Sequence, residues 1–259
     1  MALTQRAIKD LRALRYKKHR HLQGRYIIEG TRLVSEALKS TADVEQILVS
    51  SDYVKSDVWV EIQAGMTNRR LTASTISSTQ AMQISGTQHP QGIFAVIRLP
   101  SIIDHRGSGT LEPPLLLLDN IADPGNLGTL LRTADWFAIP TVWISQQGAD
   151  VFNPKVVRSG MGAHFHIPAL IQCGHDEVAE HIGRAGLRLI GAVLDGQPMT
   201  QIRPRDRNWA LVIGSEAYGL TPFWLDKLDD KVTIPGRGAA ESLNAAVAAG
   251  IILHYLCAQ

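Results

Sequence analysis

The feature that most constrains the fold is a series of short, largely apolar runs in the second half of the sequence. The segments between the runs have the periodicity of helices. The runs are "LLLLD" (115–119), "PTVWIS" (140–145), "HFHIPAL" (164–170), "LRLIGAVL" (187–194), "WALVIG" (209–214) and "KVTIP" (231–235). Strands without a polar face have to be covered on both sides, so the pattern predicts an α/β fold with a parallel sheet flanked by helices.

The residues before this region predict a second, smaller α/β domain. From residue 1 to about 99, helical stretches such as "TRLVSEALKS" alternate with β-branched runs such as "RYIIEG" and "GIFAVIRL". The segment 100–114, "PSIIDHRGSGTLEPP", gathers Pro, Gly and Ser between two apolar runs and is typical of a linker. We therefore predict a domain at 1–99, a linker at 100–114 and a second domain at 115–259.

Composition and cysteine usage exclude several classes of protein. Hydrophobic residues make up 45% and charged residues 19% of the chain, and no run approaches the roughly 18 to 20 apolar residues of a membrane span. The stretch "MALTQRAIKDLRALRYKKHR" lacks the apolar core of a secretion signal. Cys173 and Cys257 have neither a CxxC partner nor a histidine pair at metal spacing. We expect a cytoplasmic protein without a disulfide scaffold, a metal site or a membrane segment.

Basic side chains crowd the first 25 residues, although the net charge of the whole chain is only +2. Asp10 alone opposes them. The basic residues are Arg6, Lys9, Arg12, Arg15, Lys17, Lys18, Arg20 and Arg25. Such a cluster either binds a polyanion through phosphate contacts or is a solvated helix face, and the charge pattern alone favours neither interpretation.

Three loops at the predicted carboxyl ends of strands combine glycine with small polar residues, and ligands of open parallel sheets bind at such ends. The first, "DNIADPGNLGTLLRTAD" (119–135), opens an amphipathic helix whose start is marked by Asp123, Pro124 and Asn126, with Asn126 as a candidate cap. Arg132 lies off the apolar stripe and close to the predicted helix start, where the macrodipole disfavours a cation. A ligand-facing arginine and an ordinary surface ion pair both remain open.

The other two loops follow later strands. In "LVIGSEAYGL" (211–220) an apolar strand ends in Gly-Ser-Glu without the G-x-S-x-G pattern of a nucleophile elbow, so Glu216 is either a helix cap or an active group. In "IPGRGAAESLNAAVAAGIILHYL" (234–256) a turn leads to Ser242 and Asn244 at the start of a helix that is apolar nearly all round. Such a helix has to be buried, in the domain core or against another subunit.

Together the three loops resemble, in order and spacing, the three motifs of the SpoU or TrmH family in the SPOUT superfamily of RNA methyltransferases. The patterns are N-x-G-x-x-x-R-T-A, G-S-E-x-x-G-L and I-P-x-x-G-x-x-x-S-L-N, and the resemblance covers most of residues 115–256, including "NPKVVRSGMGAHFHIP". The first half, with "YIIEGTRLVSEAL", resembles the ribosomal-protein-like substrate-binding domain that precedes the catalytic domain in members acting on ribosomal RNA.

The resemblance implies a 2'-O-methyltransferase that uses S-adenosyl-L-methionine, with a trefoil knot in the C-terminal sheet and a homodimer formed through that domain. The family's polar active-site positions fall on Asn126, Arg132, Glu216, Ser242 and Asn244. The residues expected to hold the cofactor are Gly214, Ile234, Pro235, Ser242, Leu243 and Asn244. Two residues depart from the family pattern, because Ala217 stands where glycine is usual and Gly236 stands where methionine is common.

An RNA substrate favours the phosphate-binding interpretation of the basic residues. The residues predicted to bind RNA are Lys17, Lys18, Arg20, Arg25 and Arg32. In the reaction, the site has to align an activated methyl group with a ribose 2'-hydroxyl and handle one proton. A guanidinium is a poor general base. We therefore expect Arg132 to stabilise the developing alkoxide, with a role as base as the alternative.

Two other functions are compatible with the sequence. One is a transfer-RNA 2'-O-methyltransferase, and the other is a non-catalytic RNA-binding protein that retains the fold. Members that act on transfer RNA more often lack the separate N-terminal domain, so residues 1–99 favour ribosomal RNA of the 23S type. The intact Asn126, Arg132, Glu216, Ser242 and Asn244 count against a protein that has lost catalysis.

Overall fold

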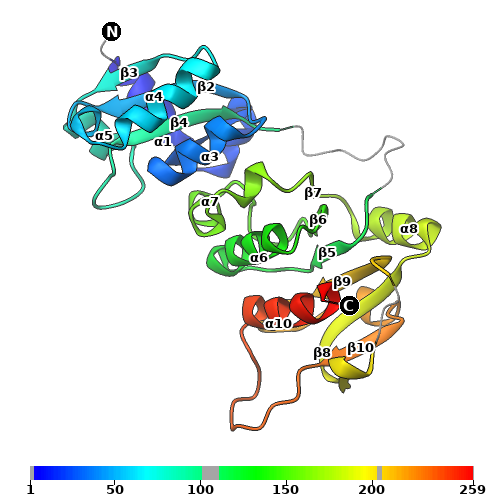
Figure 1. Cartoon of the computed structure of the whole chain (residues 1–259). Coiled ribbons are helices and arrows are strands. Elements are labelled where there is room, and N and C mark those ends of the chain that lie inside the picture. The colour runs from blue at the N-terminus through cyan, green and yellow to red at the C-terminus, as the bar shows by residue number, and fades with distance from the viewer. Residues whose placement is uncertain (1–2, 101–110, 203–205, 259) are drawn as a thin grey trace. The chain divides into compact units, whose positions relative to one another are not determined.

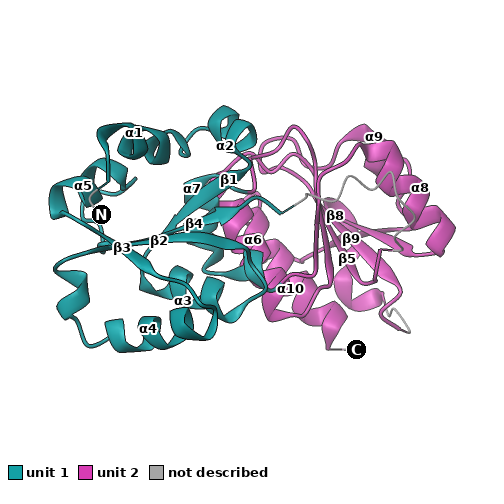
Figure 2. Cartoon of the chain, turned by 90° about the horizontal axis from the view of Figure 1, so that it is seen from above, with its two compact units in different colours: residues 1–101, 152–166 teal, residues 102–151, 167–259 magenta. Residues whose placement is uncertain are grey.

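The computed structural model describes residues 3–100, 111–202 and 206–258, so most of the predicted linker, residues 101–110, lies outside the described residues. The chain divides into two compact units, shown in different colours in Figure 2. Unit 1 comprises Met1–Ser101 and Phe152–His166, and unit 2 comprises Ile102–Val151 and Ile167–Gln259. Unit 1 thus includes 152–166, a segment that the sequence assigned to the C-terminal domain.

Unit 1 is built on a mixed four-stranded sheet with the order β1-β4-β2-β3. β4 pairs antiparallel with β1 and β2, and β3 pairs parallel with β2. The strands are β1 (Arg25–Glu29), β2 (Val44–Ser50), β3 (Ala73–Ile76) and β4 (Ile93–Arg98). Ile93 through Ile97 are each at most 1% exposed, so β4 lies at the centre of this core.

Helices cover both faces of the sheet of unit 1. α1 and α5 pack on one face, where Leu11 and Ile84 join Leu48, Phe94 and Val96 in one apolar cluster, while α3 and α4 lie on the other face (Figure 2). The helices are α1 (Gln5–Ala13), α2 (Lys17–Gln23), α3 (Thr31–Lys39), α4 (Trp59–Asn68), α5 (Ser78–Ile84) and α7 (Pro154–Gly160), with short 3-10 turns η1 (Tyr53–Lys55) and η2 (Ala163–Phe165).

Unit 2 contains a six-stranded sheet with the order β10-β8-β9-β5-β6-β7, and all of its strand pairs are parallel (Figure 1). This confirms the predicted parallel sheet. The strands are β5 (Leu115–Leu118), β6 (Thr141–Ile144), β7 (Ala169–Ile171), β8 (Arg188–Pro198), β9 (Trp209–Ile213) and β10 (Asp230–Thr233). All four leucines of β5 are fully buried, as continuous apolar strands require.

The predicted strand at 164–170 is wrong over its first five residues, 164–168. His164 lies in η2, and β7 begins only at Ala169. Ala169 pairs with Thr141, which is the first residue of β6. The residues before Ala169 therefore have no neighbouring strand with which to pair.

The helices of unit 2 are α6 (Pro124–Trp136), α8 (His175–Ala185), α9 (Pro222–Leu225) and α10 (Ala245–Cys257), with a 3-10 turn η3 (Met199–Gln201). The apolar stripe predicted for α6 is buried at Leu127, Leu130, Leu131 and Ala134. No helix that the structure describes is both long enough and apolar enough to cross a bilayer.

The α6 and α10 helices run side by side in the same direction (Figure 1). Near their N-termini, Asn244 is hydrogen-bonded to Asn126. Further along, a Cβ at Gly250 would lie 3.8 Å from the Thr133 side chain, and beyond it the His254 and Phe137 rings are 6.2 Å apart. The N-terminal ends of the two helices therefore lie together, at the carboxyl edge of the parallel sheet.

Candidate active site

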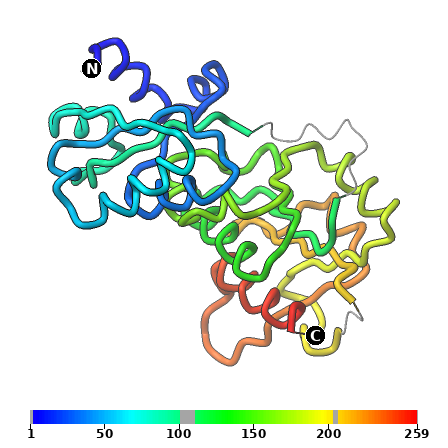
Figure 3. Tube along the Cα trace, turned by 45° about the horizontal axis from the view of Figure 1, so that its top comes forward, coloured from blue at the N-terminus to red at the C-terminus, as the bar shows by residue number. Residues whose placement is uncertain are grey.

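The sheet order brings the three predicted loops to one region. β9 pairs directly with β5, so the loops that follow these strands, 119–123 and 214–221, are neighbours. β10 lies at the sheet edge, and the segment 234–244 leads from it to α10 (Figure 3, orange). Because α10 begins beside α6, this segment returns the chain to the first two loops.

Three of the predicted residues meet at this point, and we call them the polar cluster: Asn126, Glu216 and Asn244. The Asn126 Nδ2 donates to Glu216 Oε1 in a short hydrogen bond. The Asn244 Nδ2 donates to Asn126 Oδ1 at 3.0 Å. Residues 90 and 118 positions from Asn126 in the sequence are thus joined in one chain of hydrogen bonds.

The electrostatics of this place favour a negative charge. The free N–H groups at a helix N-terminus carry a partial positive charge, and here the N-termini of α6 and α10 are adjacent. The Glu216 carboxylate is exposed at this point and is bonded to the first turn of α6. The two helix ends therefore stabilise an anion at the edge of the site.

The assignment of helix caps differs from the sequence prediction at α6. Asp123, and not Asn126, caps the helix, because its Oδ1 accepts from the Asn126 backbone N–H at 2.8 Å. The Asn126 side chain is thereby left for Glu216 and Asn244. At α10 the cap is Asn244, whose Oδ1 accepts from Ala246 N at 3.0 Å. Ser242 precedes this cap and is exposed.

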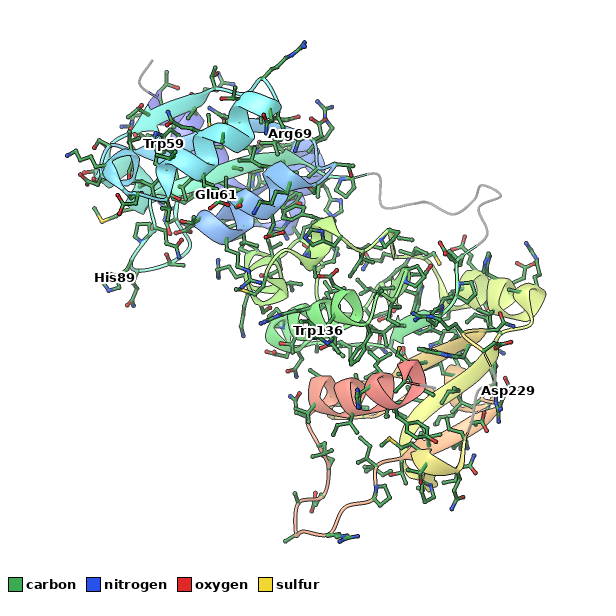
Figure 4. The ribbon with its side chains drawn as sticks, viewed as in Figure 1. Trp59, Glu61, Arg69, His89, Trp136 and Asp229 are labelled. Carbon is green, nitrogen blue, oxygen red and sulfur yellow. The ribbon has the colours of Figure 1, made fainter. Side chains whose placement is uncertain are left out.

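Arg132 lies apart from the polar cluster within one chain. Among the described residues no hydrogen bond or ion pair joins Arg132 to Asn126, Glu216 or Asn244. Arg132 is exposed, and at helical spacing it shares the outer face of α6 with Trp136, which is 83% exposed and is labelled in Figure 4. It also lies eight residues after Pro124, the first residue of α6. Arg132 is therefore beyond the first turn, and the unfavourable interaction of a cation with the helix dipole does not apply to it.

The loop that carries Glu216 is closed tightly on itself. Ser215 N donates to Gly219 O at 3.1 Å, and Gly219 N donates to Ser215 O at 2.9 Å. Gly219 has a φ of +67°, and a Cβ at Gly214 would lie 2.2 Å from the Gly219 carbonyl carbon. Gly219 requires glycine because of its positive φ, and Gly214 requires glycine because a side chain would collide with the Gly219 backbone.

The residues predicted to hold the cofactor lie close in sequence to Glu216 and Asn244 of the polar cluster. Gly214 and Ile234 are partly buried at the ends of β9 and β10, whereas Pro235, Ser242 and Leu243 are exposed. This donor set suits S-adenosyl-L-methionine, because exposed main chain at strand ends can bond an adenine or an amino acid group, and Ile234 and Leu243 offer apolar surface. A Cβ at Gly236 would meet nothing within 4 Å, so the family's larger residue would fit there.

The residues predicted to bind RNA lie in unit 1 and fall into two groups. Lys17, Lys18 and Arg32 are exposed, and the partly buried Arg25 lies 3.6 Å from Glu45. Arg20 is only 2% exposed. Because it is buried, Arg20 does not offer its charge to RNA, and the prediction for this residue needs correction.

Arg20 has a structural task instead. Its Nη1 donates to Leu14 O at 2.9 Å and to Arg15 O at 2.8 Å, which ties α2 to the end of α1. Arg15 is similarly occupied, since its Nη2 donates to Ile84 O at 2.8 Å. Burial, followed by the repulsion from Arg12, lowers the pKa of the Arg15 guanidinium.

Two polar residues beside the site, the buried Asp119 and the partly exposed His175, were not predicted as site residues. Asp119 is fully buried directly after β5, and its Oδ1 lies 3.1 Å from His175 Nε2. An aspartate that ends an apolar strand was the available signal, whereas nothing in the sequence connects it with His175. Elsewhere, His166 Nε2 lies 3.0 Å from Glu36, and the described residues contain no group of three side chains suited to a metal ion.

The fold and the polar cluster define a class of protein: an α/β enzyme whose parallel sheet carries its active groups at the carboxyl edge, preceded by a smaller domain. Residues 113–254 match the SpoU rRNA Methylase family, and residues 5–95 match the MRM3-like substrate binding domain. The chain belongs to the SpoU rRNA methylase family.

Similar proteins agree with this assignment over most of the chain. The 23S rRNA (guanosine(2553)-2'-O)-methyltransferase RlmP of Bacillus subtilis is 36% identical over 96% of this chain and 95% of its own length. The mitochondrial rRNA methyltransferase 3 of Homo sapiens is 29% identical over 90% of this chain and 67% of its own length. The SpoU methyltransferase AviRb of Streptomyces viridochromogenes, solved in complex with AdoMet, has a TM-score of 0.85 and 26% identity, covering 99% of this chain and 98% of its own.

These comparisons confirm the resemblance predicted from the three loops. They also confirm the class of enzyme, an RNA methyltransferase of the SpoU type, and S-adenosyl-L-methionine as its cofactor.

Proposed function

We propose that this protein transfers a methyl group from S-adenosyl-L-methionine to a ribose 2'-hydroxyl of ribosomal RNA, of the 23S type. The observation that carries the proposal is the polar cluster, in which the side chains of Asn126, Glu216 and Asn244 are joined between two helix N-termini. Membership of the SpoU family supports it, as does the likeness to RlmP over nearly the full length of both chains.

The ends of β9 and β10 would hold the cofactor. Gly214, Ile234 and Pro235 would offer it main-chain groups, and Leu243 would offer apolar surface from the segment before α10. When bound, the cofactor supplies a methyl group on a sulfonium that is already activated for transfer. The methyl group needs no further activation. The task of the chain is therefore to align the ribose hydroxyl and to stabilise the negative charge that develops on its oxygen.

Arg132 stabilises the alkoxide that develops on the ribose oxygen. A guanidinium keeps its charge and offers five donors in a fixed plane, so it suits an oxyanion better than it suits proton removal. Asn126 and Glu216 hold the first and second loops together, and Ser242 and Asn244 orient the segment that precedes α10. The proton passes to water or to a substrate phosphate.

The active protein is a homodimer formed through its C-terminal domain. Three exposed apolar side chains on and beside the paired helices support this arrangement: Trp136 on α6, Leu243 before α10 and Val247 on α10 are 83%, 46% and 51% exposed. Arg132 shares the outer face of α6 with Trp136, so a dimer through this face brings it beside the partner subunit. Sedimentation of the purified protein at micromolar concentration tests this assignment, and a monomer would contradict it.

The N-terminal domain binds the RNA. Its likeness to a substrate-binding domain over residues 5–95 supports this role, and the exposed Lys17, Lys18 and Arg32, together with the partly buried Arg25, are the proposed phosphate contacts. We assign 1–99 to RNA binding, 100–114 to the linker and 115–259 to the catalytic domain, which contains the family's trefoil knot. The likeness to the bacterial enzyme RlmP supports a cytoplasmic location for this protein.

Mapping of 2'-O-methyl groups in a deletion strain and its parent tests the substrate. We expect one ribosomal RNA position to lose its methyl group in the deletion strain, and expression of the wild-type protein to restore it. The Glu216→Ala variant should not restore it, because the polar cluster is broken. Unchanged ribosomal RNA combined with a lost methyl group on transfer RNA would refute the substrate, and the absence of any lost methyl group would refute the activity.

A further inference from the structure

The loop that carries Glu216 is fastened at both of its ends to a single residue, Asp119. Before the loop, the Asp119 backbone N–H donates to Ile213 O at 2.8 Å. After the loop, Asp119 Oδ2 accepts from the Thr221 backbone N–H at 2.8 Å. Asp119 also opens the segment that leads into α6 and Asn126. One buried residue therefore connects the two loops whose side chains meet in the polar cluster.

A second residue holds the Asp119 carboxylate in this orientation. His175, the first residue of α8, has its Nε2 3.1 Å from Asp119 Oδ1. A carboxylate oxygen accepts, so Nε2 is the donor. The imidazole is partly buried and contacts three aromatic rings, with centroid separations of 5.1 Å to Trp143, 5.3 Å to Phe223 and 5.9 Å to Trp224. These rings leave the histidine little freedom to turn away.

Because the Asp119 carboxylate is buried, its hydrogen bonds are needed to stabilise it. Asp119 is 0% exposed, and a buried carboxylate without partners is strongly unfavourable. Its two oxygens are taken by two different segments, one by α8 and one by the loop end at Thr221. An apolar residue at position 119 could fill the same space, but it could not accept the two hydrogen bonds. The role of the carboxylate is therefore to hold the loop end and α8 in place.

We propose that Asp119 and His175 are positioning residues for the methyl-transfer site: together they hold the loop 214–221 so that Glu216 stays in register with Asn126. Neither residue touches the reacting atoms. The proposal rests on the proposed function for its effect on catalysis, whereas the effect on the loop itself is independent of that function.

Four variants, two of which are matched controls, test the proposal without removing the buried carboxylate. Thr221→Pro deletes the N–H that Asp119 binds, and the φ of −65° at Thr221 is the value that proline adopts. Thr221→Val is its matched control, because it keeps the N–H and removes only a hydroxyl oxygen that has no partner among the described residues. His175→Phe keeps a ring among the aromatic residues and removes the donor, and His175→Gln restores a donor at the position of Nε2.

Hydrogen exchange of the 215–220 amides and titration of the full-length protein with S-adenosyl-L-methionine are the measurements. We expect Thr221→Pro and His175→Phe to speed exchange in the loop and to weaken cofactor binding about 10- to 100-fold, the value of a hydrogen bond to a charged group. Thr221→Val should match the wild type, His175→Gln should recover most of the loss, and RNA affinity should stay unchanged in all four variants.

Wild-type exchange in the loop of both folded variants would overturn the proposal, as would equal effects of Thr221→Pro and Thr221→Val. Faster exchange together with unchanged cofactor affinity would also overturn it, since the loop would then be irrelevant to the site. If the wild-type protein itself did not bind S-adenosyl-L-methionine, the proposed function would fail, and the exchange measurement would still decide whether Asp119 and His175 hold the loop.

Discussion

Arg20 on α2 and Arg132 on α6 carry the same guanidinium, and the sequence predicted RNA binding for Arg20 and a catalytic role for Arg132, yet their surroundings are opposite. Arg20 is 2% exposed and donates to two backbone carbonyls of its own unit. Arg132 is exposed on the outer face of its helix, next to the exposed Trp136. An arginine in a basic stretch can thus be a structural group, and the number of charges in a stretch overestimates the charge offered to a ligand.

The largest expected effect is the loss of methyl transfer when Arg132 is replaced, because a catalytic role is proposed for Arg132 and not for Arg20. Arg132→Lys should lower kcat by about 100- to 1000-fold, because lysine keeps the charge but loses the fixed plane of donors that stabilises the alkoxide. The Kd for S-adenosyl-L-methionine should stay within twofold of wild type. Single-turnover methylation and calorimetric titration provide the two numbers.

Arg184→Lys is the matched control for this variant. Arg184 is an exposed helical arginine of the same unit, and among the described residues it pairs with Glu180 on the preceding turn of α8, so its replacement should leave kcat unchanged. Near-normal turnover of Arg132→Lys would sink the assignment of Arg132 as the oxyanion-stabilising group.

The second prediction concerns stability. Arg20→Ala should lower the free energy of unfolding of unit 1 by about 2 to 3 kcal/mol, because two carbonyl groups lose a charged donor at a buried position. Urea denaturation followed by circular dichroism measures the change. The neighbouring Lys18→Ala is the control, with an expected change below about 0.5 kcal/mol at an exposed position. An Arg20→Ala protein of wild-type stability would contradict the structural role.

The smallest expected effect tests the exposed basic side chains. The double variant Lys17→Ala, Lys18→Ala should weaken RNA binding several-fold and lower the slope of log K against log salt concentration by about 1.5, as expected for two lost phosphate contacts. Affinity for S-adenosyl-L-methionine should not change. Filter binding at several salt concentrations measures the slope.

Lys39→Ala serves as the control for the double variant, because Lys39 is an exposed lysine of the same unit that already pairs with Glu61. If the slope for the double variant equalled the wild-type slope, the basic stretch of α2 would be a solvated face, and the distinction between Arg20 and its neighbours would lose its functional meaning.

The six strands of unit 2 were predictable because their apolar runs have no polar face and can only be covered on both sides. The prediction failed at His164 and His166, since an apolar run shows that a segment is buried and not whether a neighbouring strand is there to pair with it. β6 begins at Thr141, so residues before Ala169 have no partner.

Within the site, residue identities were predictable and contacts were not. Asn126, Glu216 and Asn244 follow from the motifs, but the same motifs assigned the α6 cap to Asn126. Asp123 takes that place because the residue before Pro124 has the extended backbone that a cap needs, with φ −76° and ψ 119°. The Asn126 Oδ1, the atom that a cap would use, is therefore available to accept from Asn244.

The sequence by itself determined the parallel sheet, the smaller domain before it and the polar residues of the three loops, because apolar periodicity and short motifs are local properties. Only the tertiary structure decided that these loops meet. β10 lies three strands from β5, about 14 Å across the sheet, and the segment 234–244 has to recross that distance to set Asn244 beside Asn126. It also decided which arginines are exposed and that Asp119 holds both ends of one loop, since burial and hydrogen-bond partners depend on residues distant in the chain.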